Sequence, residues 1–339
     1  MASSSLRVLL IGSHRTERIE RGVERAMQRA GHRTLLIDDR RLRRNIGTAL
    51  TQRWVLAAAR RFRPDYVFFS KSLGLTLETA AELARDRPSA LWYQDPQWYG
   101  DALLPDIAHT IAVGHLVGTF FVTGFEGEWR AMGLNAKLLP SAADGDIRPV
   151  PADPAYAADV AFIGTGPGVS HGGAGFAPER AEFLASVAAG LGTAARVRVW
   201  GGGWDAWRDR IEWGGRPVFG RDLSRVCSSS AIVLGINPSR AAGATLYTSD
   251  RLWMMVLGGG FYLGRRTPGL DRLLVDGEHC AWYDDVGECV ARARYYLDHP
   301  TDRARIRAAG ERLVRARHTF DQRVDYLLTG REWNDGGRG

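Results

Sequence analysis

The chain has 339 residues, a formal net charge of +7 and a pI near 9.6, and 45% of its residues are hydrophobic. This length is comfortable for two domains, each with a core of its own. No run of about 18 apolar residues occurs, which excludes a membrane-spanning helix, and the first residues lack a signal-peptide layout, so we expect a cytoplasmic protein without an integral membrane segment.

Arginine carries almost all of the positive charge, and its planar guanidinium group suits phosphate. The charge therefore agrees with an anionic substrate, a nucleic acid or a lipid surface, and equally with the codon usage of a GC-rich genome. The three cysteines, Cys227, Cys280 and Cys289, are odd in number and lack metal-type spacing. We expect them to be reduced and buried.

In the first 145 residues, short apolar runs alternate with helical segments. We expect strands at 6–11, 34–37, 66–69, 90–93, 118–123 and 136–139, and helices at 16–30, 49–61, 77–85 and 127–132. This alternation predicts an α/β domain with a doubly wound parallel sheet. The working groups of such sheets lie at the carboxyl ends of strands, which singles out His14, Lys71 and Asp95.

Residues 140–154, rich in Pro, Asp and Ala, are interpreted as a linker between domains. A second alternating series follows, with strands expected at 160–163, 197–200, 218–219, 231–235, 261–263 and 280–283, and helices at 179–191, 222–227, 252–257, 286–297 and 301–316. We expect domains at 1–145 and 155–317, a helix within 318–330 that crosses back to the first domain, and a disordered tail at 331–339.

The most informative stretch begins at Tyr247. Thr248, Ser249 and Asp250 suit the cap of a helix, and the glycines at 258–260 suit its end. A helix start offers unpaired N–H groups and a partial positive charge, to which Arg251 adds a full one. This pattern predicts binding of a phosphate or diphosphate, although an ordinary capped helix would have the same pattern.

The second half of the chain resembles the donor-binding domain of GT-B glycosyltransferases, most closely the CgeB-like group related to spore maturation proteins. The resemblance is carried by Asp159–Gly164, Arg180, Val199–Gly201, Trp204, Thr248–Arg251, Gly258–Phe261, Tyr283–Asp285, Tyr295–Pro300 and His318–Phe320, and in the first half by Trp92–Pro96. It implies two Rossmann-like doubly wound α/β domains that face each other across a cleft. It also implies sugar transfer from a UDP- or GDP-sugar without metal or cofactor.

The resemblance places donor binding on a defined set of residues. They are Gly164, Thr165, Arg180, Trp204, Ser249, Asp250, Arg251, Gly259 and Gly260. Trp204 either borders the base or only packs. Related enzymes carry a glutamate for the donor ribose where this chain has Met254, and a thioether cannot replace it. Asp250 or Ser249 compensates, the donor differs, or activity has been lost.

A transfer that inverts configuration needs a general base close to the acceptor hydroxyl. His14 and Asp95 are the two candidates, and each has an alternative role in its local turn. A retaining transfer requires neither. His171, in the glycine loop that follows Gly164, is expected to face solvent.

The chain contains no Walker motif, no H-E-x-x-H, no paired CxxC and no G-x-S-x-G, which argues against kinase, zinc and hydrolase functions. Two alternatives to a glycosyltransferase stay open. One is a nucleotide-sugar epimerase on the same fold, and the other is a non-catalytic protein that contacts nucleic acid through its arginines. The acceptor is left open among glycan, small molecule, protein and modified nucleic acid.

Overall fold

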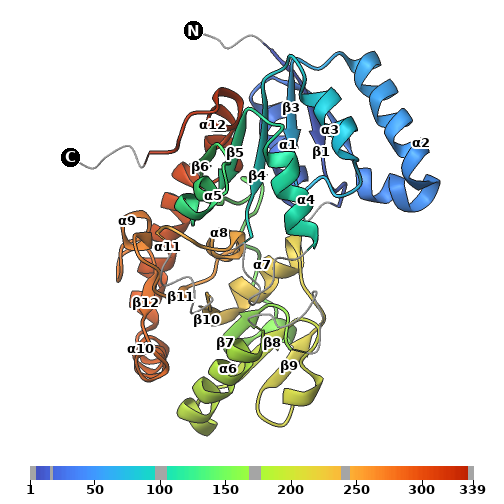
Figure 1. Cartoon of the computed structure of the whole chain (residues 1–339). Coiled ribbons are helices and arrows are strands. Elements are labelled where there is room, and N and C mark those ends of the chain that lie inside the picture. Colours follow the sequence, from blue (N-terminus) through green and yellow to red (C-terminus); the bar gives the residue numbers. More distant parts are fainter. Residues whose placement is uncertain (1–4, 16–17, 96–104, 168–176, 238–244, 335–339) are drawn as a thin grey trace. The chain divides into compact units, whose positions relative to one another are not determined.

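The computed structural model describes residues 5–15, 18–95, 105–167, 177–237 and 245–334. The chain forms two compact units. Unit 1 combines the chain up to Gly145 with the segment from Thr319 onward, and unit 2 contains Asp146–His318. In the described part of the chain each unit holds one six-stranded parallel sheet with helices around it (Figure 1), which confirms the fold class expected from the sequence.

The sheet of unit 1 has the strand order β2-β1-β3-β4-β5-β6. Its strands are β1 (Arg7–Ile11), β2 (Arg33–Ile37), β3 (Tyr66–Phe69), β4 (Ser89–Tyr93), β5 (Thr119–Val122) and β6 (Ala136–Leu138). Its helices are α1 (Ile19–Arg29), α2 (Asp39–Phe62), α3 (Leu77–Ala84), α4 (Pro105–Gly114), α5 (Glu126–Ala131), the 3₁₀ turn η5 (Phe320–Gln322) and α12 (Val324–Thr329).

Both faces of this sheet are covered, which explains why its central strands β1, β3 and β4 are mostly apolar. In β1, Leu9 and Ile11 point into one core, and Val8 and Leu10 point into the core on the other face. All four residues of β3 are buried in the same alternating way. Continuous apolar runs of this kind are the signal by which the sequence predicted the strands.

The segment that follows Thr319 packs within unit 1. Phe320 and Leu327 belong to the same core as Val8 and Leu10. Arg323 is 1% exposed, and its Nε donates to the carbonyl of Pro140 at 2.9 Å. Burial lowers the pKa of this guanidinium to about 10. The C-terminal segment therefore adds core to unit 1 across a long separation in sequence.

Two sequence-based boundaries need correction. The expected linker 140–154 is in part core, because residues 140–144 are all buried. The expected disordered tail 331–339 is anchored over its described part. There Trp333 N–H donates to the carbonyl of Leu138 at 3.1 Å, and Arg130 pairs with Glu332 at 2.6 Å. Residues 335–339 lie outside the described residues.

The sheet of unit 2 has the strand order β12-β11-β10-β7-β8-β9. Its strands are β7 (Ala158–Ile163), β8 (Val197–Trp200), β9 (Glu212–Gly215), β10 (Ser230–Gly235), β11 (Tyr262–Arg265) and β12 (Ala281–Tyr283). Its helices are α6 (Ala177–Leu191), α7 (Gly220–Ser229), α8 (Asp250–Leu257), α9 (Leu270–Leu273), α10 (Val286–Asp298) and α11 (Pro300–Arg317), with 3₁₀ turns η1 (Pro154–Tyr156), η2 (Gly192–Ala194) and η3 (Asp205–Trp207).

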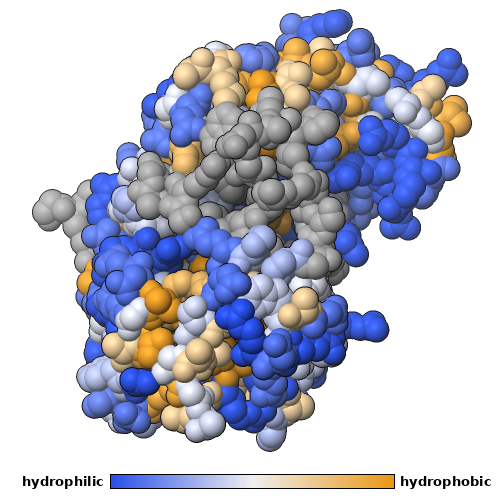
Figure 2. All heavy atoms as spheres, turned by 60° about the horizontal axis from the view of Figure 1, so that its bottom comes forward, coloured by the Kyte–Doolittle hydropathy of each residue, from blue (hydrophilic) through white to orange (hydrophobic). Residues whose placement is uncertain are grey.

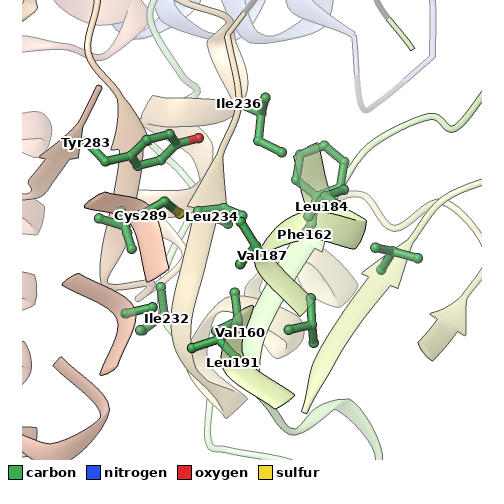
Figure 3. Close-up of a cluster of buried hydrophobic side chains, with 14 of the residues drawn as sticks. Val160, Phe162, Leu184, Val187, Leu191, Ile232, Leu234, Ile236, Tyr283 and Cys289 are labelled. Atoms are coloured by element: carbon green, nitrogen blue, oxygen red, sulfur yellow. The ribbon is translucent and has the colours of Figure 1, made fainter. Parts of the chain in front are cut away.

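Side chains from two adjacent strands and one helix build a core of unit 2. Val160 and Phe162 of β7 and Ile232 of β10 point toward Leu184 and Val187 of α6 (Figure 3). The cysteines are buried and unbonded, as expected. Burial raises the pKa of the Cys289 thiol to about 12.

The strand expected at 218–219 is wrong. Phe219 is 52% exposed and precedes α7, and the strand lies at Glu212–Gly215 instead. β9 is the edge strand of its sheet, and both Glu212 and Trp213 are exposed. An edge strand lacks the continuous apolar run that identifies a central one, so its sequence signal is weak.

Each sheet changes winding direction once. In unit 1 the chain steps outward from β1 to β2 and then returns to place β3 on the other side of β1; in unit 2 it returns between β9 and β10, which lies beside β7. Ligands of open α/β sheets bind beyond the carboxyl ends of strands at such switch points. Among the described residues no helix combines the length and apolarity needed to cross a bilayer.

Candidate functional site

Two glycine-rich turns interlock at the carboxyl ends of β7 and β8. Gly164 N–H donates to the carbonyl of Trp200, and Gly166 N–H donates to that of Gly202, each at 2.9 Å. A Cβ on Gly201 would lie 2.0 Å from the carbonyl oxygen of Gly164. Only glycine allows two backbones to approach this closely, so the turns form a compact backbone surface.

The guanidinium of Arg251 is fixed against the first of these turns. Ser249 caps α8, and its Oγ accepts from the N–H of Arg251 at 3.4 Å. Arg251 Nη1 donates to the carbonyl of Ile163 at 3.1 Å, and a Cβ on Gly164 would lie 2.5 Å from the same nitrogen. Gly164, Ser249 and Arg251, expected to act together, therefore meet at the switch point of unit 2.

Helix α8 is buried except along one face. Asp250, Arg251 and Met254 are half-buried, and helical spacing places them on the same side. Asp250 Oδ1 accepts from Ser249 Oγ at 3.0 Å. On the buried side, Trp253 stacks on His318 with ring centroids 4.4 Å apart. The start of α8 thus places a helix N-terminus and a guanidinium beside a glycine turn, a combination suited to a polyanion, with the Asp250 carboxylate next to them.

Arg180 and Trp204 hold the glycine turn in place. Arg180 is 9% exposed, and its Nη1 donates to the carbonyl of Thr165 at 2.7 Å. Trp204 is 1% exposed, and its indole N–H donates to the carbonyl of Gly164 at 2.9 Å. A ring buried to this degree presents no face to a ligand, so Trp204 packs rather than borders a base. Thr165 itself is half-buried in the turn.

Gly259 and Gly260 do not share this edge of the sheet. They follow the C-terminus of α8 and precede β11, at the opposite end of the helix from Ser249. A Cβ on Gly260 would lie 2.8 Å from Val233, and one on Gly259 would lie 2.9 Å from Pro149. Close packing accounts for both glycines, and their expected role in donor binding stays a prediction.

A buried polar pair at the carboxyl ends of β10 and β11 was missed by the sequence analysis. Asn237 Nδ2 donates to Thr267 Oγ1 at 3.1 Å, and the two residues are 5% and 1% exposed. The available signal was a polar residue directly after a buried strand at the switch point. Nearby, Tyr283 Oη donates to the carbonyl of Gly235 at 2.8 Å.

In unit 1, His14 lies just beyond β1 and is exposed. Its Nε2 hydrogen-bonds the carbonyl oxygen of Leu36 at 2.6 Å. A carbonyl oxygen only accepts, so Nε2 carries the proton and Nδ1 is the nitrogen of the neutral ring that can take up another. The backbone N–H of His14 donates to Asp38 Oδ2 at 3.0 Å. The ring is thereby held in the tautomer that leaves Nδ1 unprotonated.

Asp95 at the end of β4 forms an ion pair with Lys71 at the end of β3. Lys71 Nζ also lies 5.5 Å from the ring centre of Tyr93. Glu20, which the sequence analysis missed, accepts from Ser70 Oγ at 2.7 Å at the same edge. Its signal was a carboxylate in the first turn of the helix after β1. Residues 96–98, which follow Asp95, and His171 lie outside the described residues.

In the described ranges, no three His, Cys, Asp or Glu side chains gather so that they could hold a metal ion.

One family model and several solved structures match this chain. Residues 180–329 match the family model described as Glycosyl transferase-like. The matched segment includes Arg180, Ser249 and Arg251. A comparison with the curated proteins found no match.

Solved structures of glycosyltransferases share the fold. Anabaena HepE in complex with UDP and glucose aligns with a TM-score of 0.62 at 9% identity, covering 96% of this chain and 100% of that one. Sucrose-phosphate synthase from Thermosynechococcus elongatus aligns at 0.65 with 11% identity, covering 96% and 98%. An α-glucosyltransferase in complex with UDP and a 13-mer DNA aligns at 0.65 with 9% identity, covering 96% and 100%. At such low identities the likeness establishes the GT-B fold.

Proposed function

We propose that the chain is a glycosyltransferase that moves a hexose from a UDP-sugar to an acceptor hydroxyl without a bound metal ion. The observation that carries this proposal is the contact of Arg251 with the Gly164 turn at the start of α8. It is supported by the family match over residues 180–329 and by the UDP named in two structures of the same fold. Membership of the CgeB-like group belongs to the same proposal.

The diphosphate of the donor is proposed to lie between the Gly164 turn and the start of α8. The partial positive charge at the start of α8 and the guanidinium of Arg251 would neutralise the charge that develops on the leaving diphosphate. This arrangement would supply the positive charge that a divalent cation supplies in other transferases. Arg180 would act indirectly, by holding the carbonyl of Thr165.

Unit 1 is proposed to bind the acceptor. The acceptor oxygen attacks the anomeric carbon of the sugar, and the bond from that carbon to the diphosphate oxygen breaks with its electron pair leaving on UDP. In an inverting transfer His14 Nδ1 takes the acceptor proton. We favour His14 over Asp95 because Lys71 already pairs with the Asp95 carboxylate.

The test is to titrate purified protein with UDP- and GDP-sugars and follow thermal stabilisation and donor hydrolysis, with and without EDTA. A ligand at about 100 times its Kd stabilises a protein by about 2.7 kcal/mol, which a melting curve resolves readily. We expect stabilisation by UDP-sugars that EDTA leaves unchanged. Silence across the whole donor panel would overturn the proposal, and loss of the effect with EDTA would overturn its metal-free form.

Arg251→Ala is the matching variant. We expect donor affinity to fall about 10- to 100-fold, which is the value of a charge-assisted hydrogen bond. The affinity of Arg251→Lys should lie between those of the wild type and Arg251→Ala. Arg312→Ala is the control, because Arg312 is exposed on α11 and makes no side-chain contact among the described residues. Equal affinity in Arg251→Ala and Arg312→Ala would show that the diphosphate binds elsewhere.

Met254 favours a second candidate, a non-catalytic protein on the same fold. The residue lies on the same face of α8 as Arg251 but offers no acceptor for a ribose diol. UDP binding without any sugar turnover would support this candidate. Release of a changed free sugar nucleotide would instead indicate an epimerase.

A further inference from the structure

Helix α2 of unit 1 has an outward face that nothing in the described chain covers. Three of its large apolar side chains are exposed: Ile46 by 38%, Leu50 by 55% and Trp54 by 48%. On the inward face Thr51, Val55 and Ala59 are buried, so the second half of α2 is anchored along one side only. Figure 1 shows α2 on the outside of unit 1, and in Figure 2 hydrophobic and hydrophilic side chains mix over the upper right of the visible face.

The same helix is strongly basic. It contains seven arginines and one acidic residue, Asp39, which is 1% exposed. Arg60 pairs with Glu82 at 3.6 Å. Within the described part of the chain the other six guanidinium groups make no hydrogen bond or ion pair; they are Arg40, Arg41, Arg43, Arg44, Arg53 and Arg61. No side chain in the described ranges therefore neutralises their charge by pairing with them.

A kink divides the two features along the helix. Gly47 has φ 77 and ψ 170, which interrupts the helical backbone. Four arginines, Arg40, Arg41, Arg43 and Arg44, lie before the kink. Leu50 and Trp54 lie one turn apart after it, with Arg53 between them in sequence. Along α2, a basic segment is therefore followed by exposed apolar side chains with Arg53 beside them.

The helix is held firmly from beneath. Asp39 accepts from the N–H of Gly74 at 2.5 Å, and the side chain of Gln52 accepts from the N–H of Thr76 at 3.1 Å. Neither contact involves the exposed side chains of Ile46, Leu50 or Trp54. Its exposed apolar residues are therefore not explained by the stability of unit 1.

We propose that α2 docks unit 1 on an anionic lipid surface. Arginines bind lipid phosphates while leucine, isoleucine and tryptophan enter the boundary between headgroups and acyl chains, the combination found in interfacial helices. The phosphates of a nucleic acid would bind the arginines, but a nucleic acid has little apolar surface to contact the three large apolar side chains. An acidic protein groove could bind both the arginines and the apolar side chains. A continuous lipid surface fits them better, because it offers many phosphates to the six unpaired arginines and an apolar layer to the three apolar side chains.

The experiment measures co-sedimentation of the full chain with vesicles of phosphatidylcholine alone and of phosphatidylcholine with about 30% phosphatidylglycerol. We expect binding to the anionic vesicles to be at least about tenfold stronger, given the number of arginines. Neither donor nor acceptor is present, so the result is independent of the proposed function. Equal binding to the two vesicle types, or none, would overturn the proposal.

Three variants separate charge from apolar contact. Leu50→Ser with Trp54→Ser, and Arg40, Arg41, Arg43 and Arg44→Gln, should each weaken binding to anionic vesicles about tenfold or more. Phe219→Ser in unit 2 is the control, since Phe219 is 52% exposed and lies outside α2. Melting curves establish that all variants fold. If the α2 variants bind as the control does, α2 is not the docking surface.

A 20-base-pair duplex distinguishes lipid from nucleic acid. We expect the Leu50 and Trp54 variant to lose vesicle binding while its duplex binding is unchanged. If instead the arginine variant loses duplex binding and keeps its affinity for vesicles, the basic segment serves nucleic acid and the proposal is wrong.

Discussion

The carboxyl edges of the two sheets follow the same winding rule but carry different chemistry. At the edge of unit 2 a glycine turn meets the guanidinium of Arg251. At the edge of unit 1 stand a histidine with one nitrogen able to take a proton, the Lys71–Asp95 pair and the Glu20–Ser70 pair. Two sheets of one architecture therefore carry different side chains at their switch points, and such side chains rather than the fold determine function.

The largest effect is expected at the edge of unit 1. His14→Ala should lower kcat by about 10²- to 10⁴-fold, the usual contribution of a general base, and leave donor affinity unchanged. The measurement is steady-state kinetics with the donor identified by titration. His115→Ala is the control, because His115 is exposed in the same unit and away from the edge.

Asp95→Asn tests the rival base in the same assay. We expect a much smaller change than in His14→Ala. The assignment is reversed if Asp95→Asn shows the larger loss of kcat, and a retaining reaction is indicated if neither variant loses more than about tenfold.

The next largest effect concerns the glycine turns of unit 2. Gly201→Ala would place a methyl group 2.0 Å from the carbonyl oxygen of Gly164. Overpacking of this kind costs about 1–3 kcal/mol, so the melting temperature of unit 2 should fall by several degrees and donor binding should weaken with it. Gly127→Ala is the matched control, since nothing lies within 4 Å of that position. An unchanged melting temperature in Gly201→Ala would mean that the turns are not interlocked.

A smaller and opposite effect is expected at Met254. Met254→Glu places a carboxylate on the face of α8 that carries Arg251, and a hydrogen-bonded ribose should raise UDP affinity about tenfold. Met254→Gln, of similar size but uncharged, should gain less. Isothermal titration with UDP decides the matter, and a weaker affinity in the glutamate variant would show that the ribose lies away from this face.

The smallest effect is expected at the opposite, amino edge of unit 1. Arg7 hydrogen-bonds Asp65 at 2.8 Å and lowers the pKa of that carboxyl to about 2. A carboxyl group with a depressed pKa stabilises the fold above its unfolded pKa near 3.9 and loses that contribution as the pH falls toward 2. The pair is exposed, so we expect a difference of about 1 °C or less between wild type and Asp65→Asn above pH 5.

Melting curves between pH 2 and pH 7 check this, with Asp86→Asn as the control. The difference should vanish at the acid end, and activity should be unaffected, because this edge lies away from the switch point. A loss of sugar transfer in Asp65→Asn would contradict the separation of a structural edge from a functional one.

Local sequence determined the central strands and the cap of α8. β3 is apolar throughout and β7 is apolar from Val160 to Ile163 because helices cover both faces of their sheets, so both strands are recognisable without a structure. Ser249 is recognisable for a local reason too, since its Oγ accepts from an N–H only two residues away.

Tertiary structure decided what depends on contacts between distant residues. Trp204, for which the sequence left two roles open, packs against Gly164, and Gly259 packs on Pro149. Neither neighbour is close in sequence, so periodicity could not reveal it. The sequence analysis missed the edge strand β9 and the burial of residues 140–144 for the same reason. Burial against another segment is a property of the folded chain, and the residue types alone do not tell which segment that will be.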